Sequence, residues 1–137
     1  METNFSKLNE KQLEAVKSES KRLLVLAGAG SGKTKTLLEK LIYLMREKRV
    51  QPTNILVVTF TKNATNEMID RLVFASKNGE EYKQFMNNPK KGEAEKNKYR
   101  EDFKRANSWL SNLSISTFHS FCHNLLRKYG VSEFDNK

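Results

Sequence analysis

The feature that most constrains this chain is a glycine-rich loop between an apolar run and a helical pattern. The loop reads Ala27-Gly28-Ala29-Gly30-Ser31-Gly32-Lys33-Thr34. The run Leu23-Leu24-Val25-Leu26 precedes it, and apolar residues recur at helical spacing from Leu37 to Met45. A strand, a glycine loop and a helix in this order are the setting of a phosphate-binding P-loop. The sequence therefore predicts a site for nucleotide phosphates. An ordinary glycine-rich turn before a helix is the alternative.

Each position of the loop has an expected task in phosphate binding. Small residues let the backbone N–H groups turn inward around the phosphates, and the start of the following helix adds a positive dipole. Lys33 would neutralise the β- and γ-phosphates and the Thr34 hydroxyl would hold Mg²⁺, so these two are the expected catalytic residues. Ala27 stands where the pattern G-x-x-x-x-G-K-[ST] has its first glycine, and alanine is small enough for that position.

Composition limits the class of protein and its partners. The chain has 137 residues, enough for one domain, and no apolar run approaches the roughly 18–20 residues of a membrane span. Met1-Glu2-Thr3-Asn4 does not resemble a signal peptide, and Cys122 alone cannot form an intrachain disulfide, so we expect a cytoplasmic protein without membrane contact. The net charge of +9 favours a polyanion such as nucleic acid as partner, although basicity could also serve solubility alone.

The order of apolar runs and helical patterns predicts an α/β fold. Strands are expected at Arg22–Ala27, Asn54–Phe60 and Leu113–Thr117, each followed by a helical pattern. The first two runs are continuously apolar, which is typical of parallel strands covered on both faces. We therefore expect a parallel sheet flanked by helices. The last helix should turn a stripe toward that sheet and stop near Gly130; the stripe comprises Phe118, Phe121, Cys122, Leu125, Leu126 and Tyr129.

Two further segments are predicted to be helical. Asn9 and Gln12 have capping-box spacing, which predicts a helix from Glu10 to about Lys17. The segment from about 77 to 111 is rich in Lys, Glu and Asn and suggests a solvated helical insertion with one short and one longer helix.

Three segments besides the loop carry a family resemblance. They are Leu8-Asn9-Glu10-Lys11-Gln12, Thr59-Phe60-Thr61-Lys62-Asn63-Ala64-Thr65-Asn66-Glu67-Met68, and Thr117-Phe118-His119-Ser120-Phe121-Cys122. With the loop, they resemble the Q motif, motif Ia, motif Ib and Walker A of the first motor domain of UvrD/Rep-type DNA helicases. The resemblance spans about residues 8–129. It implies a RecA-like P-loop NTPase fold, present here as a partial domain over 1–137.

The resemblance also implies tasks for individual residues. Gln12 would read adenine, and residues 27–34 would bind ATP with Mg²⁺ at Thr34. Single-stranded DNA would contact Thr59, Phe60, Thr61, Asn63, Thr117, His119 and Ser120, with Phe60 stacking on a base. The alternatives are that Gln12 only closes the capping box, that Phe60 packs in the core, and that His119 is a structural histidine. Lys62 and Asn63 are transposed relative to the family pattern, and Thr65 replaces an alanine.

A P-loop motor also needs an acidic pair at the end of an apolar strand, and no apolar run in this sequence ends in Asp-Glu. We therefore expect an N-terminal part of a longer 3′→5′ DNA helicase of repair, replication or recombination, inactive in ATP hydrolysis by itself. Its partners would be single-stranded DNA or a duplex junction and the remainder of the motor. The alternatives are part of an AddA/RecB-type helicase–nuclease subunit and a binding module without turnover. A small phosphotransferase is disfavoured.

Overall fold

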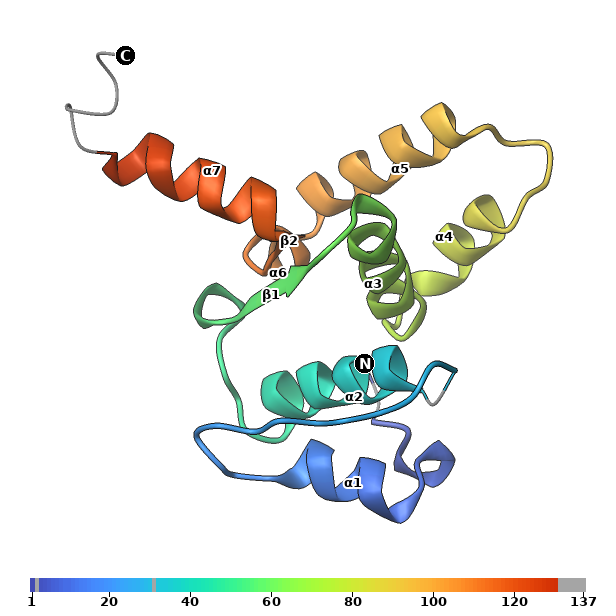
Figure 1. Cartoon of the computed structure of the whole chain (residues 1–137). Helices are drawn as coiled ribbons and strands as arrows, with labels where there is room; N and C mark the ends of the chain where they lie inside the picture. The colour runs from blue at the N-terminus through green and yellow to red at the C-terminus, as the bar shows by residue number, and fades with distance from the viewer. Residues whose placement is uncertain (2, 31, 131–137) are drawn as a thin grey trace.

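The centre of the fold is a pair of short parallel strands with helices around it (Figure 1). A computed structural model describes residues 1, 3–30 and 32–130. Strand β1, Leu56–Thr59, pairs with β2, Ser114–Thr117, in a register that sets Leu56 beside Ser114 and Thr59 beside Thr117. The helices are α1 (Glu10–Lys17), α2 (Lys33–Arg46), α3 (Lys62–Phe74), α4 (Gly79–Met86), α5 (Glu93–Ala106), α6 (Ser108–Ser111) and α7 (Phe118–Tyr129), with short 3₁₀ turns at Phe5–Lys7 and Pro52–Asn54. The predicted α/β class with a parallel sheet is confirmed at this level.

Polar residues at their first turns explain where three of the helices begin. Asn9 and Gln12 form the predicted capping box, and α1 spans the predicted residues. The Thr61 hydroxyl accepts a hydrogen bond from Ala64 N (3.1 Å) and caps α3, while the Thr117 hydroxyl caps α7 through Ser120 N (3.1 Å). Both strands therefore end within two residues of a capped helix.

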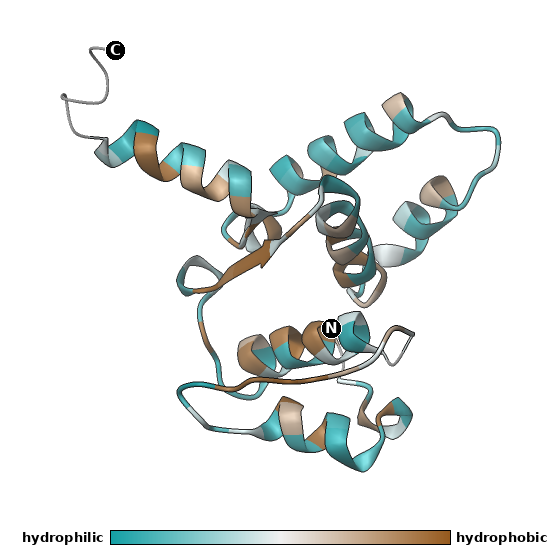
Figure 2. Cartoon of the chain, viewed as in Figure 1, coloured by the Kyte–Doolittle hydropathy of each residue, from teal (hydrophilic) through white to brown (hydrophobic). Residues whose placement is uncertain are grey.

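The predicted strand at Arg22–Ala27 is wrong for the part of the chain described. These residues join α1 to the glycine loop without strand pairing. Figure 2 shows the brown, apolar ribbon of this segment passing between α1 and α2. Leu24 and Leu26 are 81% and 86% exposed. An apolar run becomes a strand only when a neighbour supplies ladder hydrogen bonds, and β1 and β2 pair with each other instead.

The prediction that α7 turns an apolar stripe to the sheet is also wrong. None of its twelve residues is buried, and Cys122 is exposed. Helix α7 contacts β1 and β2, but the sheet has only two four-residue strands and offers little surface. The helix does end before Gly130, as predicted.

The core lies between α2, α3, the insertion helices and one face of the sheet. Ile55 and Val57 are buried on that face, whereas Leu56 between them is 47% exposed. This alternation shows that one face of the sheet is well covered and that the other remains open to water. The expectation that both faces are covered is therefore wrong for β1. The remaining core residues include Leu41, Ile42, Leu72, Val73, Leu110, Leu113 and Ile115.

The segment expected to be a solvated insertion contributes a buried charge pair. Arg100 of α5 donates to both carboxylate oxygens of Asp70 on α3, at 2.7 and 2.8 Å. Tyr82 of α4 donates to the same carboxylate at 2.5 Å. The hydrogen bond to Asp70 raises the pKa of Arg100, and burial raises the pKa of Tyr82, so both remain hydrogen-bond donors. The cluster fixes two helices of the insertion against α3.

Among the described residues, no helix combines the length and apolar character needed to cross a bilayer.

We expect Asp70→Ala to lower the free energy of unfolding by about 3 kcal/mol, because it leaves the buried Arg100 charge without its partner. Chemical denaturation measures this loss. Glu67→Ala is the matched control, since Glu67 lies one turn earlier on α3 and pairs with Arg71 on the surface. Its cost should be about 0.5 kcal/mol or less. Equal costs for the two variants would contradict a structural role for the Asp70–Arg100 pair.

Candidate nucleotide and nucleic-acid site

The glycine loop ends in a left-handed turn that opens directly into α2. Gly30 and Gly32 have φ angles of 73° and 82°, a region that residues with a Cβ rarely adopt. The carbonyl of Gly32 accepts from the backbone N–H of Thr36 (2.9 Å) and from its hydroxyl (3.0 Å). Lys33 and Thr34 therefore occupy the first turn of α2, where backbone N–H groups have no intrahelical acceptor.

Several features of this loop suit phosphate binding. Lys33 is exposed and Thr34 is half-buried at the start of a long helix, so a cation, a hydroxyl and free N–H groups lie together. Ser31 of the predicted site lies outside the described residues. Ala27, Gly28 and Ala29 lead into the loop with exposed backbone. The described residues hold no group of three or more His, Cys, Asp and Glu that could bind a metal. The predicted Mg²⁺ contact at Thr34 rests on the glycine-loop pattern and stays a prediction.

The structure brings Gln12 against the loop. A Cβ atom placed on Gly32 would lie 2.8 Å from Gln12 Nε2. The oxygen of the same amide accepts from Asn9 N at 3.0 Å, which is half of the capping box. Gln12 therefore closes the cap and also touches the glycine loop, so its capping geometry is compatible with its predicted place at a nucleotide.

Side chains of α2 hold the N-terminal segment in this position. The Lys40 ammonium donates to the carbonyls of Val16 (3.0 Å) and Ser18 (2.6 Å) at the end of α1. Burial lowers the pKa of Lys40, and the nearby Lys48 lowers it further. The Glu39 carboxylate accepts from Asn4 N at 3.1 Å. These contacts set Gln12 beside the loop, although the residues are far apart in sequence.

The two predicted DNA-contacting segments lie side by side. The register places Thr59 opposite Thr117, so both segments leave the sheet at the same edge. Asn63, His119 and Ser120 are exposed there, in the first turns of α3 and α7. Two helix N-termini at one edge place free N–H groups and positive dipole ends next to each other. This arrangement suits phosphate binding.

Three predicted phosphate donors also have structural tasks. Thr61 and Thr117 accept the capping bonds of α3 and α7, and Thr117 donates to the Ser120 hydroxyl at 3.1 Å. The Thr59 hydroxyl lies 2.6 Å from that of Thr65, a buried residue of α3. The threonines thus position the edge, and the exposed Asn63, His119 and Ser120 are the side chains most open to a ligand.

Phe118 is a residue of this edge that the sequence reasoning assigned elsewhere. Its ring centroid lies 5.3 Å from that of Phe60, with an interplanar angle of 39°. Phe60 is 89% exposed, so core packing, the alternative considered for it, does not describe this structure. A signal was available in the sequence, because a phenylalanine directly follows the last threonine of each strand, in Thr59-Phe60 and in Thr117-Phe118.

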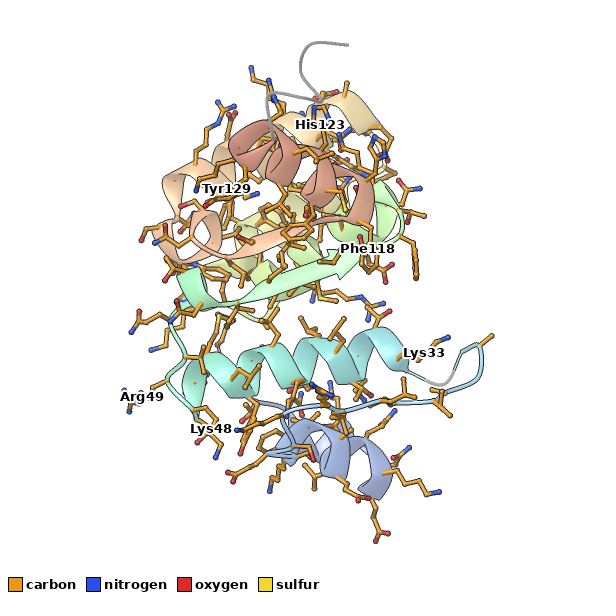
Figure 3. All side chains as sticks on the ribbon, turned by 60° about the vertical axis from the view of Figure 1, so that its left-hand side comes forward. Lys33, Lys48, Arg49, Phe118, His123 and Tyr129 are labelled. Atoms are coloured by element: carbon orange, nitrogen blue, oxygen red, sulfur yellow. The ribbon has the colours of Figure 1, made fainter. Side chains whose placement is uncertain are left out.

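The nucleotide loop and the strand ends face the same side of the molecule. In Figure 3, Lys33 and Phe118 lie on the right-hand side, while Lys48 and Arg49 lie at the other end of α2. Ligands of open parallel sheets bind at the carboxyl edge of the strands. The candidate site is this side of the molecule, with the glycine loop at one end and an aromatic and polar surface at the other.

Comparison with known proteins finds a matching family and similar helicases. The family described as "UvrD/REP helicase N-terminal domain" matches residues 8–137. The chain is 53% identical over 68 residues to an ATP-dependent DNA helicase PcrA of Bacillus subtilis, covering 50% of this chain and 9% of the relative. It is 46% identical over 72 residues to PcrA of Staphylococcus aureus, covering 53% and 10%. The chain thus spans about a tenth of the length of these relatives.

We expect Gly32→Ala to destabilise the protein by at least about 1–2 kcal/mol, the cost of a Cβ in the left-handed region. The new methyl would also press on Gln12 Nε2. Gly28→Ala is the matched control in the same loop, because it has no atom within 4 Å of its Cβ position and no positive φ. Thermal unfolding compares the two variants. A Gly32→Ala variant as stable as Gly28→Ala would contradict the loop geometry described.

Proposed function

Because the chain belongs to the UvrD/REP helicase N-terminal domain family, we propose that it forms the ATP-binding and single-stranded-DNA-contacting part of an ATP-dependent DNA helicase. The observation that carries the proposal is the Thr59–Thr117 register, which joins both candidate DNA segments at one edge. Phe118 at this edge lies on the same side of the molecule as Lys33 of the glycine loop (Figure 3). The ATP-dependent helicase activity of the relatives supports the reaction class. The proposed 3′→5′ movement follows from the family resemblance.

In this proposal the P-loop binds the triphosphate of ATP within a RecA-like fold. Backbone N–H groups of the loop and of the first turn of α2 would surround the phosphates, and Lys33 would neutralise their charge. Thr34 would hold Mg²⁺. Gln12 would hydrogen-bond adenine, since an amide offers both a donor and an acceptor. Because no apolar strand in the sequence ends in Asp-Glu, we propose that this chain by itself binds ATP without hydrolysing it.

Single-stranded DNA would lie along the edge formed by 59–63 and 117–120. Its phosphates would be held by Asn63, His119 and Ser120 and by the first N–H groups of α3 and α7. Its bases would stack on aromatic side chains, which tolerate any sequence. Such a mode suits a translocating motor because nothing in it depends on base identity.

The remainder of the motor is the proposed protein partner. Leu24, Leu26 and Leu56 are exposed on extended backbone, and α7 leaves Leu126 64% and Tyr129 68% exposed. Large apolar side chains that are exposed in this way are candidates for contact with another part of a protein. The helicase relatives are about ten times longer than the matched region, so their additional chain is the proposed cover for these surfaces.

We expect Lys33→Ala to weaken ATP binding about tenfold or more, because a charged hydrogen bond to phosphate contributes about 1.5–3 kcal/mol. Isothermal calorimetry with ATP and Mg²⁺ measures this. Lys98→Ala is the charge-matched control, because Lys98 is exposed on α5 in the insertion. Equal ATP affinity for both variants would contradict a phosphate site at the loop.

We expect the variant Asn63→Ala/His119→Ala to bind a short oligothymidylate more weakly than the unmodified chain, because both side chains are exposed in the first turns of α3 and α7, beside the proposed phosphate path. Fluorescence anisotropy at two salt concentrations measures affinity and its salt dependence. The comparison is a variant with Lys90, Lys91, Lys96 and Lys98 changed to alanine, the rival basic surface. If only this second variant loses affinity, DNA follows the insertion and the proposed path is wrong.

A further inference from the structure

The two phenylalanines at the strand ends form one aromatic unit that bridges both DNA segments. Phe60 follows β1 directly, and Phe118 opens α7 directly after β2. Their rings are in contact, at 5.3 Å between centroids. The contact follows from the register, because the residues after the paired Thr59 and Thr117 come next to each other.

The two rings differ in how they are supported. Phe60 is 89% exposed, between the end of β1 and the cap of α3, so protein covers little of its ring. Phe118 is 50% exposed, and its backbone belongs to a helix capped by Thr117. The Phe60 ring contacts the Phe118 ring. Phe118 is therefore the supported member of the pair, and it limits the orientations open to Phe60.

We propose that Phe118 is a positioning residue for DNA binding, which holds the Phe60 ring ready to stack on a base of single-stranded DNA. This inference rests on the proposed function. An isolated exposed ring loses side-chain freedom when it stacks, whereas a ring held by a neighbour has lost part of that freedom already. The free face of Phe60 then receives the base, and Phe118 strengthens the stack without touching the DNA.

The surroundings favour a nucleobase over a protein surface as the occupant. The rings are bordered by the polar residues Thr61, Asn63, His119 and Ser120, and by the two helix N-termini. An apolar ring among groups suited to phosphate matches a nucleotide, which has a flat base and a charged backbone. The chain's charge of +9 also favours a polyanion.

The test compares two ligands of equal length, an oligothymidylate and an oligomer of abasic units, which keeps the phosphates and lacks bases. Phe60→Ala should lower affinity for oligothymidylate roughly 5- to 150-fold, and Phe118→Ala roughly 2- to 12-fold. Neither change should alter affinity for the abasic oligomer by more than about twofold, because that oligomer has no base to stack on either ring. Phe118→Tyr should retain oligothymidylate binding, and adding Phe118→Ala to Phe60→Ala should have no further effect.

Leu125→Ala is the matched control, since Leu125 is 47% exposed on the same helix. It should leave both affinities unchanged, and thermal unfolding of every variant identifies any that fail to fold. Phe118→Ala overturns the inference if it weakens both ligands equally or weakens neither, and Phe118→Tyr does so if it loses as much affinity as Phe118→Ala. If the unmodified chain binds neither ligand in a salt-dependent way, the proposed function itself is wrong, a result distinct from failure of the inference.

Discussion

The parallel pairing of Leu56–Thr59 with Ser114–Thr117 is the interaction on which the rest of the structure depends. It brings two segments that are far apart in sequence to one edge, where each passes into a capped helix. Because the strands are parallel, their carboxyl ends coincide, and so do the N-termini of α3 and α7. The polar and aromatic residues that we assign to DNA meet only through this pairing.

A long helical crossover separates the two strands, and its packing keeps them in register. Asp70, Tyr82 and Arg100 join α3, α4 and α5 in one buried cluster. Around it, the Tyr82 ring contacts the rings of Phe74, Tyr99 and Phe103. The mixed charge of this segment suggested a solvated surface, yet its Arg100 is buried in an ion pair with Asp70 of α3. Composition reports how many charges a segment has, whereas burial depends on which of them find a partner.

The open surfaces have a common physical origin. Leu24, Leu26 and Leu56 lie on extended backbone whose second face has little cover, and α7 rests against only the ends of two short strands. An apolar run in the sequence predicts a buried segment, and an apolar stripe on a helix predicts packing against a sheet. Burial needs a second surface that covers the first, and a sequence pattern describes only the first surface. The proposed remainder of the motor would supply the covering surface.

The sequence by itself determined the local features: the Asn9–Gln12 cap and helix α1, the glycine loop before α2, the strands near 56–59 and 114–117, and the stop at Gly130. These depend on residues a few positions apart, so hydrogen-bonding capacity and hydrophobic period suffice to predict them. The tertiary structure decided that 22–27 is unpaired, that Gln12 lies against Gly32, that Asp70 pairs with Arg100 and that the Phe118 ring contacts the Phe60 ring. Each of these depends on contacts between distant segments, which arise from strand register and helix packing and are not encoded in any local pattern.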